Sequence, residues 1–170
     1  MNQCLTENEF SALALQGYNR IPLVLQTFAD LDTPLSVYLK LANQPYSYLL
    51  ESVVGGERFG RYSVIGLPAR TRLEAYDNLV QTVSGSITSK FDTDNALDYI
   101  ETFLAKFKVA PNAALPRFGG GLAGYFGYDS VRYIEPRLAG QAQPNTLHTP
   151  DVLLLLSEEV VVVDNLSGKL

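Results

Sequence analysis

The sequence predicts an α+β fold, a mostly antiparallel β-sheet or sandwich with about three helices on its outside. Short apolar runs alternate with turn-forming residues through the middle of the chain, which is typical of strands joined by tight connections. Three other segments carry apolar residues at helical spacing behind a capping residue. Hairpin-like spacing between the apolar runs favours antiparallel pairing.

Composition predicts a globular chain and excludes several classes of protein. The 170 residues are 46% hydrophobic and 18% charged, so residues 1–170 are expected to form one domain with a substantial core. The formal net charge is -5 and no basic cluster is present, which argues against a nucleic-acid partner. One cysteine and one histidine cannot assemble a Cys/His zinc site.

The longest apolar runs, 152–156 and 160–163, are too short to cross a bilayer, so no membrane partner is expected. The first residues are polar and acidic rather than those of a signal peptide. A cytoplasmic location is therefore expected.

Each of the three expected helices begins behind a residue that caps its first turn. Thr6 and Glu9 have the spacing of a capping box. Thr33 precedes a proline, which is favoured at the first helical position. The third helix, 95–108, follows Asp94 as its expected cap and presents one apolar face. The apolar stripe expected for the second helix is Leu35, Tyr38, Leu39 and Ala42.

Strands are expected wherever a short apolar or alternating run is bounded by turn residues. A hairpin is expected around Ser84-Gly-Ser86. The four valines at 160–163 precede a turn at 164–168 and should pair with a returning strand beyond Leu170, so we expect a fragment of a longer protein. The expected strands are 23–28, 46–52, 61–66, 70–76, 78–83, 87–91, 152–156 and 160–163.

A candidate ligand site lies where an apolar strand ends, at Glu51 and Ser52. A carboxylate and a hydroxyl there could hold the ammonium group of a small ligand through charge-assisted hydrogen bonds. The alternative is a strand-end turn in which Ser52 bonds to nearby backbone.

For each of two glycine-rich segments, a structural role is an alternative to ligand binding. Segment 55–66 lacks the spacing of a phosphate-binding loop, and Glu57 with Arg58 or Arg61 is expected to form a surface ion pair. The glycines of 119–128 allow either a ligand wall or close backbone packing, and close packing is favoured.

No assembled catalytic centre is expected in this chain. Glu158 and Glu159 are neighbours on a strand and point to opposite faces, so they cannot share a proton or a metal ion. No nucleophile has an evident adjacent base. We therefore expect no catalytic residue, no metal ligand and no cofactor-binding residue here.

Taken together, these motifs resemble the N-terminal region of anthranilate synthase component I. Each motif is weak alone, but their order and spacing along most of the chain are specific. The matching segments are 33–40, 48–52, 55–58, 60–66, 120–129, 151–154 and 162–165.

The resemblance implies an N-terminal, regulatory domain that stops before a catalytic chorismate-binding domain, which would complete its sheet. The whole enzyme of this family converts chorismate to anthranilate with Mg2+, using ammonia from a glutamine amidotransferase partner. The N-terminal region carries much of the feedback site for L-tryptophan. This chain alone is therefore expected to be inactive, and its partners would be L-tryptophan, the amidotransferase and its own catalytic domain.

The family motifs place two groups of residues at the tryptophan site. Leu50, Glu51 and Ser52 would contact the ligand near its ammonium group, and Arg61, Tyr62 and Ser63 would form the facing strand. Val64 would share an apolar wall with Leu50. In the whole enzyme, Ser52→Ala is expected to weaken inhibition by tryptophan and leave uninhibited turnover nearly intact. Two alternatives stay open: a fragment of aminodeoxychorismate synthase component I, and a standalone amino-acid-binding module.

Overall fold

The computed structural model describes residues 5–29, 31–51, 60–115, 118–138 and 145–170, which form two compact units. Unit 1 is assembled from residues 1–68, 107–120 and 157–170, and unit 2 from residues 69–106 and 121–156. Both units contain antiparallel sheet and helix, so the predicted α+β class is confirmed. The single domain over residues 1–170 stays a prediction.

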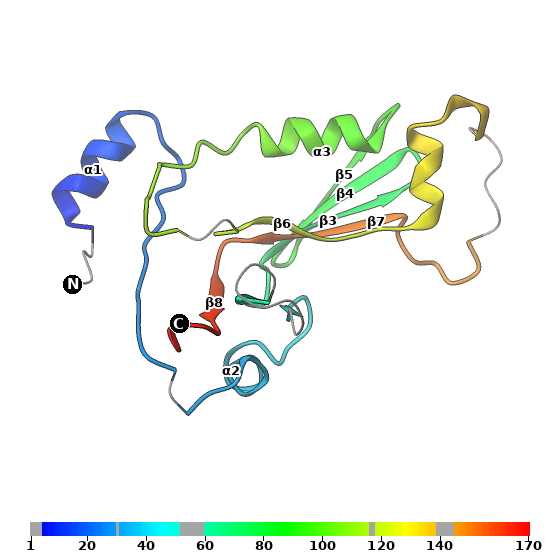
Figure 1. The fold of residues 1–170 in the computed structure, drawn as a ribbon. Coiled ribbons are helices and arrows are strands. Elements are labelled where there is room, and N and C mark those ends of the chain that lie inside the picture. Colours follow the sequence, from blue (N-terminus) through cyan, green and yellow to red (C-terminus); the bar gives the residue numbers. More distant parts are fainter. Residues whose placement is uncertain (1–4, 30, 52–59, 116–117, 139–144) are drawn as a thin grey trace. The chain divides into compact units, whose positions relative to one another are not determined.

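Unit 2 is built on a five-stranded sheet with the strand order β5-β4-β3-β7-β6 (Figure 1). The expected hairpin is confirmed: β4 and β5 pair from Leu79↔Asp92 to Ser84↔Ile87. Gly85 sits in its turn with a φ of 59°, a left-handed conformation that glycine adopts without strain. The strands are β3 (Thr71–Tyr76), β4 (Leu79–Ser84), β5 (Ile87–Asp92), β6 (Gly121–Phe126) and β7 (Val152–Ser157).

Helix α3 (Ala96–Leu104) lies along one face of this sheet in Figure 1, where Ala96 and Ile100 join the core of unit 2. The expected cap, Asp94, is wrong. The N-cap is Asn95, whose side chain accepts a hydrogen bond from Leu97 N at 2.8 Å and donates one to Tyr133 O at 3.0 Å.

Helix α3 also ends four residues earlier than expected, before Lys108. The Lys108 carbonyl accepts hydrogen bonds from the amides of Asn19 and Arg20, and the Lys108 amide donates to the Asn19 side chain. Because its backbone makes these long-range hydrogen bonds, Lys108 is not part of helix α3.

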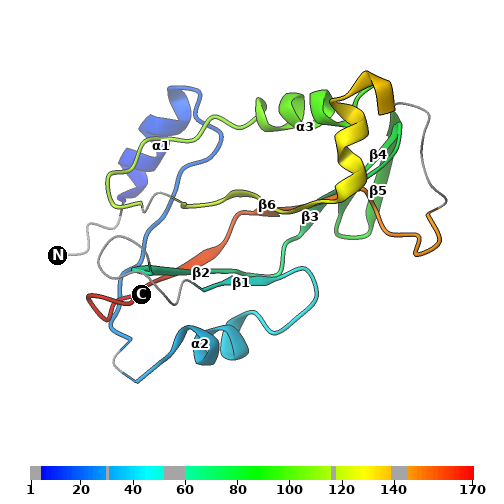
Figure 2. The same cartoon turned by 45° about the vertical axis from the view of Figure 1, so that its right-hand side comes forward.

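In unit 1, three antiparallel strands in the order β1-β2-β8 form a second sheet (Figure 2). These are β1 (Tyr48–Leu50), β2 (Tyr62–Gly66) and β8 (Val160–Asp164). Helix α2 (Pro34–Leu41) packs Val37 against a core that includes Ile65 and Val163.

The Thr33 cap of α2 is confirmed, but its expected apolar stripe is partly wrong. Ala42 is buried together with Val37, whereas Leu35 and Leu39 are more than half exposed. The register of the helix on β2 and β8 selects the buried face, and that register is a tertiary property.

One strand prediction is wrong, and another stays a prediction. The valine run pairs with β2 along one edge, from Tyr62↔Asp164 to Gly66↔Val160. Because β8 is the last strand in the order β1-β2-β8, the pairing of its other edge with a strand beyond Leu170 stays a prediction. Residues 23–28 form no strand; Phe28 makes only an isolated bridge with Lys169, which also bridges Asp164.

The remaining helices are short. Helix α1 (Glu7–Leu15) has the expected Thr6–Glu9 capping box but buries none of its residues. Two 3-10 helices, η1 (Tyr128–Tyr133) and η2 (Pro136–Leu138), follow β6. No helix in the described ranges has the length and apolar character needed to span a membrane.

Candidate functional site

Four of the residues predicted to bind a ligand lie at one end of the three-stranded sheet: Leu50, Glu51, Arg61 and Tyr62. Because β1 and β2 are antiparallel, the end of β1 meets the start of β2, and Leu50 lies directly opposite Val64. Exposed Glu51 follows Leu50, at the same end as Arg61. Ser52, the expected hydroxyl, lies outside the described residues.

The apolar residues of the site share one face of the sheet. Side chains alternate along a strand, so Leu50, Tyr62 and Val64 point away from the α2 side. Leu50 is 56% exposed and Tyr62 is 42% exposed. Val64 also pairs with Val162 of β8, which widens this apolar face.

Ser63 lies on the opposite face of β2 and is fully buried. Its hydroxyl oxygen accepts a hydrogen bond from the Asn165 amide at 3.1 Å. The structure therefore gives Ser63 a bond within the protein, and its contact with a ligand stays a prediction.

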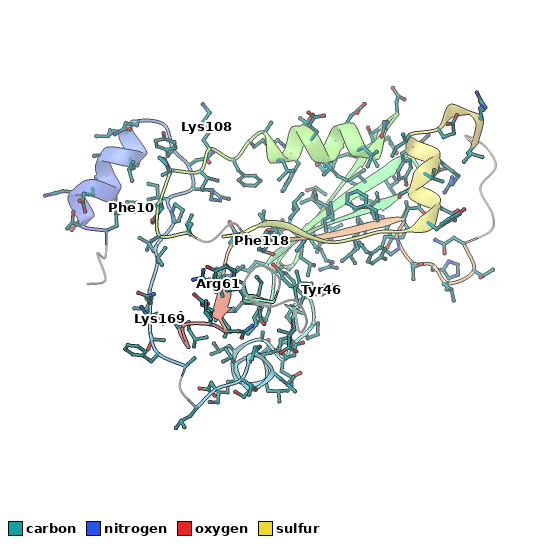
Figure 3. The ribbon with its side chains drawn as sticks, viewed as in Figure 1. Phe10, Tyr46, Arg61, Lys108, Phe118 and Lys169 are labelled. Atoms are coloured by element: carbon teal, nitrogen blue, oxygen red, sulfur yellow. The ribbon has the colours of Figure 1, made fainter. Side chains whose placement is uncertain are left out.

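Arg61 is held by Asp164 in a two-pronged ion pair. Arg61 Nε donates to Oδ1 at 3.1 Å and Nη2 donates to Oδ2 at 2.7 Å. The guanidinium carbon also lies 4.8 Å from the ring centre of Tyr62. Figure 3 shows Arg61 beside β8, from which Asp164 comes. The expected pairing with Glu57 lies outside the described residues.

The ion pair favours the charged form of both partners. Hydrogen bonds from Arg61 hold the pKa of Asp164 well below its usual range, although partial burial opposes the shift. The amides of Leu166 and Ser167 also donate to this carboxylate. Asp164 in turn raises the pKa of Arg61, so both groups are charged at neutral pH.

This shift predicts an acid-dependent loss of stability. A carboxylate with a depressed pKa stabilises the fold above its unfolded pKa of about 3.9, and that stabilisation disappears as the pH falls toward the folded value. We expect the stability difference between wild type and Asp164→Asn to be largest near pH 6 and to shrink below pH 4. Urea unfolding of both proteins at several pH values measures this difference, and a pH-independent difference would contradict it.

Two residues to which the sequence analysis assigned no site role, Asp164 and Asn165, organise this end of the sheet. The Asn165 side chain bonds to Gly60 O at 3.2 Å as well as to Ser63, and its backbone amide donates to Arg61 O at 2.8 Å. The sequence feature that could have indicated their role is this polar pair directly after the valine run. No local pattern shows which residues the pair bonds to.

Two polar clusters lie among the described residues of unit 2, and neither has the arrangement of a catalytic centre. Burial raises the pKa of Glu74, but hydrogen bonds from Arg72 and Gln81 outweigh it and leave the pKa lowered. In the other cluster the Tyr133 hydroxyl donates to Asp151 at 2.7 Å, and burial together with this bond raises the pKa of Tyr133. These carboxylates are already bonded within the fold.

The described part of the chain also contains no group of three or more His, Cys, Asp or Glu side chains that could hold a metal ion. The architecture therefore defines a class: an antiparallel α+β protein with two compact units and no metal cluster among its described residues.

Comparison with known proteins narrows this class. No family model matches the chain. Over 98% of its length the chain is 56% identical to anthranilate synthase component 1 of Pseudomonas aeruginosa and 56% identical to that of Neisseria gonorrhoeae. It is 38% identical over its whole length to the Aquifex aeolicus protein of the same name. The chain thus matches the N-terminal part of anthranilate synthase component I, and the predicted resemblance is confirmed.

The chain spans about a third of the length of these relatives, with 34% coverage of each. A solved structure, anthranilate synthase component I of Streptococcus pneumoniae, matches 86% of the chain and 30% of the solved one with a TM-score of 0.51. At 22% sequence identity this likeness shows the shared fold.

Proposed function

We propose that this chain is the N-terminal, regulatory part of a cytoplasmic anthranilate synthase large subunit. The complete enzyme would convert chorismate and ammonia to anthranilate, the first step of tryptophan biosynthesis, with a glutamine amidotransferase as its partner. The observation that carries this proposal is 56% identity over 98% of the chain to proteins of that name.

The chemistry would take place outside the described residues. No cluster of metal-ligating side chains occurs among them, so the Mg2+ expected for the whole enzyme is assigned to no residue here. The chain by itself would then be inactive, and its catalytic domain would be its covalent partner.

The experiment that tests this proposal extends the chain to the length of its relatives along its native reading frame. The complete protein should form fluorescent anthranilate from chorismate, ammonium and Mg2+, whereas the 170-residue chain should form none. Aminodeoxychorismate as the product would favour the folate-pathway alternative. A reading frame that stops at Leu170 would favour a standalone binding module.

The role proposed for the chain is to bind L-tryptophan as a feedback inhibitor. Glu51 and Ser52 would bind the ammonium group, and the Arg61 guanidinium would bind the carboxylate. The indole would lie on the apolar wall of Leu50 and Val64. Tyr62 and Ser63 belong to the same facing strand. Inhibition requires that tryptophan binds the inactive state of the enzyme more tightly than the active one.

The sharpest test of this role among described residues is Glu51→Gln in the complete enzyme. The change removes the negative charge but keeps the shape of the side chain, so a charge-assisted bond to the ammonium group is lost. We expect about a tenfold higher concentration of tryptophan for half-inhibition, with uninhibited turnover nearly unchanged.

The matched control is Glu101→Gln, an equally conservative change at an exposed position of α3 in unit 2. It should leave inhibition unchanged. Equal sensitivity of the Glu51 variant and wild type would remove Glu51 from the site.

A further inference from the structure

Among the described residues, Arg61 bonds through one edge of its guanidinium group. Nε and Nη2 bond to Asp164, while Nη1 has no hydrogen bond to any described residue. The side chain is 40% exposed. A guanidinium is planar and has more than one edge that matches a carboxylate. No described residue occupies the edge that carries Nη1, so this edge can bind a second acceptor.

The orientation of this second edge is fixed from several sides. Asp164 holds the first edge, the Tyr62 ring lies against the guanidinium, and the Arg61 carbonyl accepts the Asn165 amide. A long arginine side chain is otherwise free to sample many rotamers, so these contacts remove most of its freedom before any ligand arrives.

Asp164 is itself held in place by the turn that follows β8. Its Oδ1 accepts the amides of Leu166 and Ser167 at 3.1 and 3.4 Å. Its backbone amide donates to Lys169 O at 2.8 Å, and its carbonyl accepts the Gly168 amide at 2.9 Å. The carboxylate is therefore a rigid support rather than a mobile counter-ion.

We propose that Asp164 is a positioning residue, which orients Arg61 so that its Nη1 edge recognises the carboxylate of an α-amino acid ligand. This inference rests on the proposed tryptophan site and adds to it a residue of β8, 103 positions from Arg61 in sequence. Asp164 does not touch the ligand and acts only through the guanidinium.

Charge alone predicts the opposite effect. The carboxylate of Asp164 repels a ligand carboxylate, so a purely electrostatic role would make Asp164→Asn bind tryptophan more tightly. A positioning role makes the same variant bind more weakly, because Arg61 must then be ordered by the ligand. The sign of the change separates the two roles.

The experiment is titration calorimetry on the complete synthase with two probes, L-tryptophan and tryptamine, which lacks the carboxylate. We expect Asp164→Asn to weaken tryptophan binding about fivefold or more and to leave tryptamine binding within about twofold. Asp164→Glu should keep most of the affinity for tryptophan. Asp92→Asn, the same change on the exposed edge strand β5, should alter neither affinity.

Several results would overturn the inference. They are unchanged or tighter binding of tryptophan by Asp164→Asn, an equal loss of tryptophan and tryptamine, or a Glu variant as weak as the Asn variant. The equal loss would indicate a merely structural role. Failure of the wild-type enzyme to bind tryptophan would instead refute the proposed feedback site. The wild-type enzyme is therefore measured before any variant.

Discussion

Replacing Gly124 with alanine is expected to destabilise unit 2 by about 3 kcal/mol or more, at the upper end of the cost of overpacking. Gly124 lies in β6, and a Cβ at this position would sit 2.0 Å from the carbonyl oxygen of Leu153. That oxygen belongs to the backbone of β7, the neighbouring strand, so it cannot move aside without breaking the sheet order. The close packing favoured for segment 119–128 is confirmed at this residue.

Gly119→Ala is the matched control for this change. A Cβ at Gly119 would approach the end of the Leu115 side chain at 3.0 Å, and a side-chain terminus can rotate away. We expect a cost below about 1 kcal/mol. Urea unfolding followed by far-ultraviolet circular dichroism measures both variants, since the chain contains no tryptophan to report by fluorescence. Equal stability of the two variants would show that β7 tolerates a side chain at Gly124.

Truncation of Leu73 to alanine is expected to cost about 2–5 kcal/mol, the range found for large-to-small changes in well-packed cores. Leu73 on β3 is 1% exposed and belongs to the cluster that contains Ile100 of α3 and Leu154 of β7. The cavity would open between the sheet and its helix, where backbone on both sides limits collapse.

Leu147→Ala provides the comparison within unit 2, because Leu147 is 81% exposed. Its loss should change the free energy of unfolding by less than about 0.5 kcal/mol. A shift in the midpoint of thermal unfolding for the Leu73 variant alone would support the assigned core. Similar midpoints for the two variants would contradict it.

Local features of the sequence predicted much of the fold. The capping box at Thr6, the Thr33 cap and the β4–β5 hairpin were all predicted and are present. Each depends on residues within a few positions of one another, so turn chemistry and side-chain caps are sufficient to specify it. The α+β class followed because these local signals agree along the chain.

Predictions that needed a distant partner were less successful. The sequence did not predict that the valine run pairs with β2, which lies far from it along the chain. The exposed positions of Leu35 and Leu39 depend on how α2 sits on the sheet. Periodicity identifies an apolar strand or helix face but does not state what covers it.

The candidate site shows the same division. The sequence by itself predicted that one apolar strand ends close to Glu51 and that another starts close to Arg61, because short-range patterns mark strand ends. The structure ends β1 at Leu50 and begins β2 at Tyr62. Only the tertiary structure decided that Asp164 fixes the Arg61 guanidinium and that Asn165 holds the hydroxyl of Ser63. These partners lie more than 100 residues apart along the chain. Their meeting depends on the pairing of β2 with β8, which the burial of an entire apolar face selects rather than any local signal.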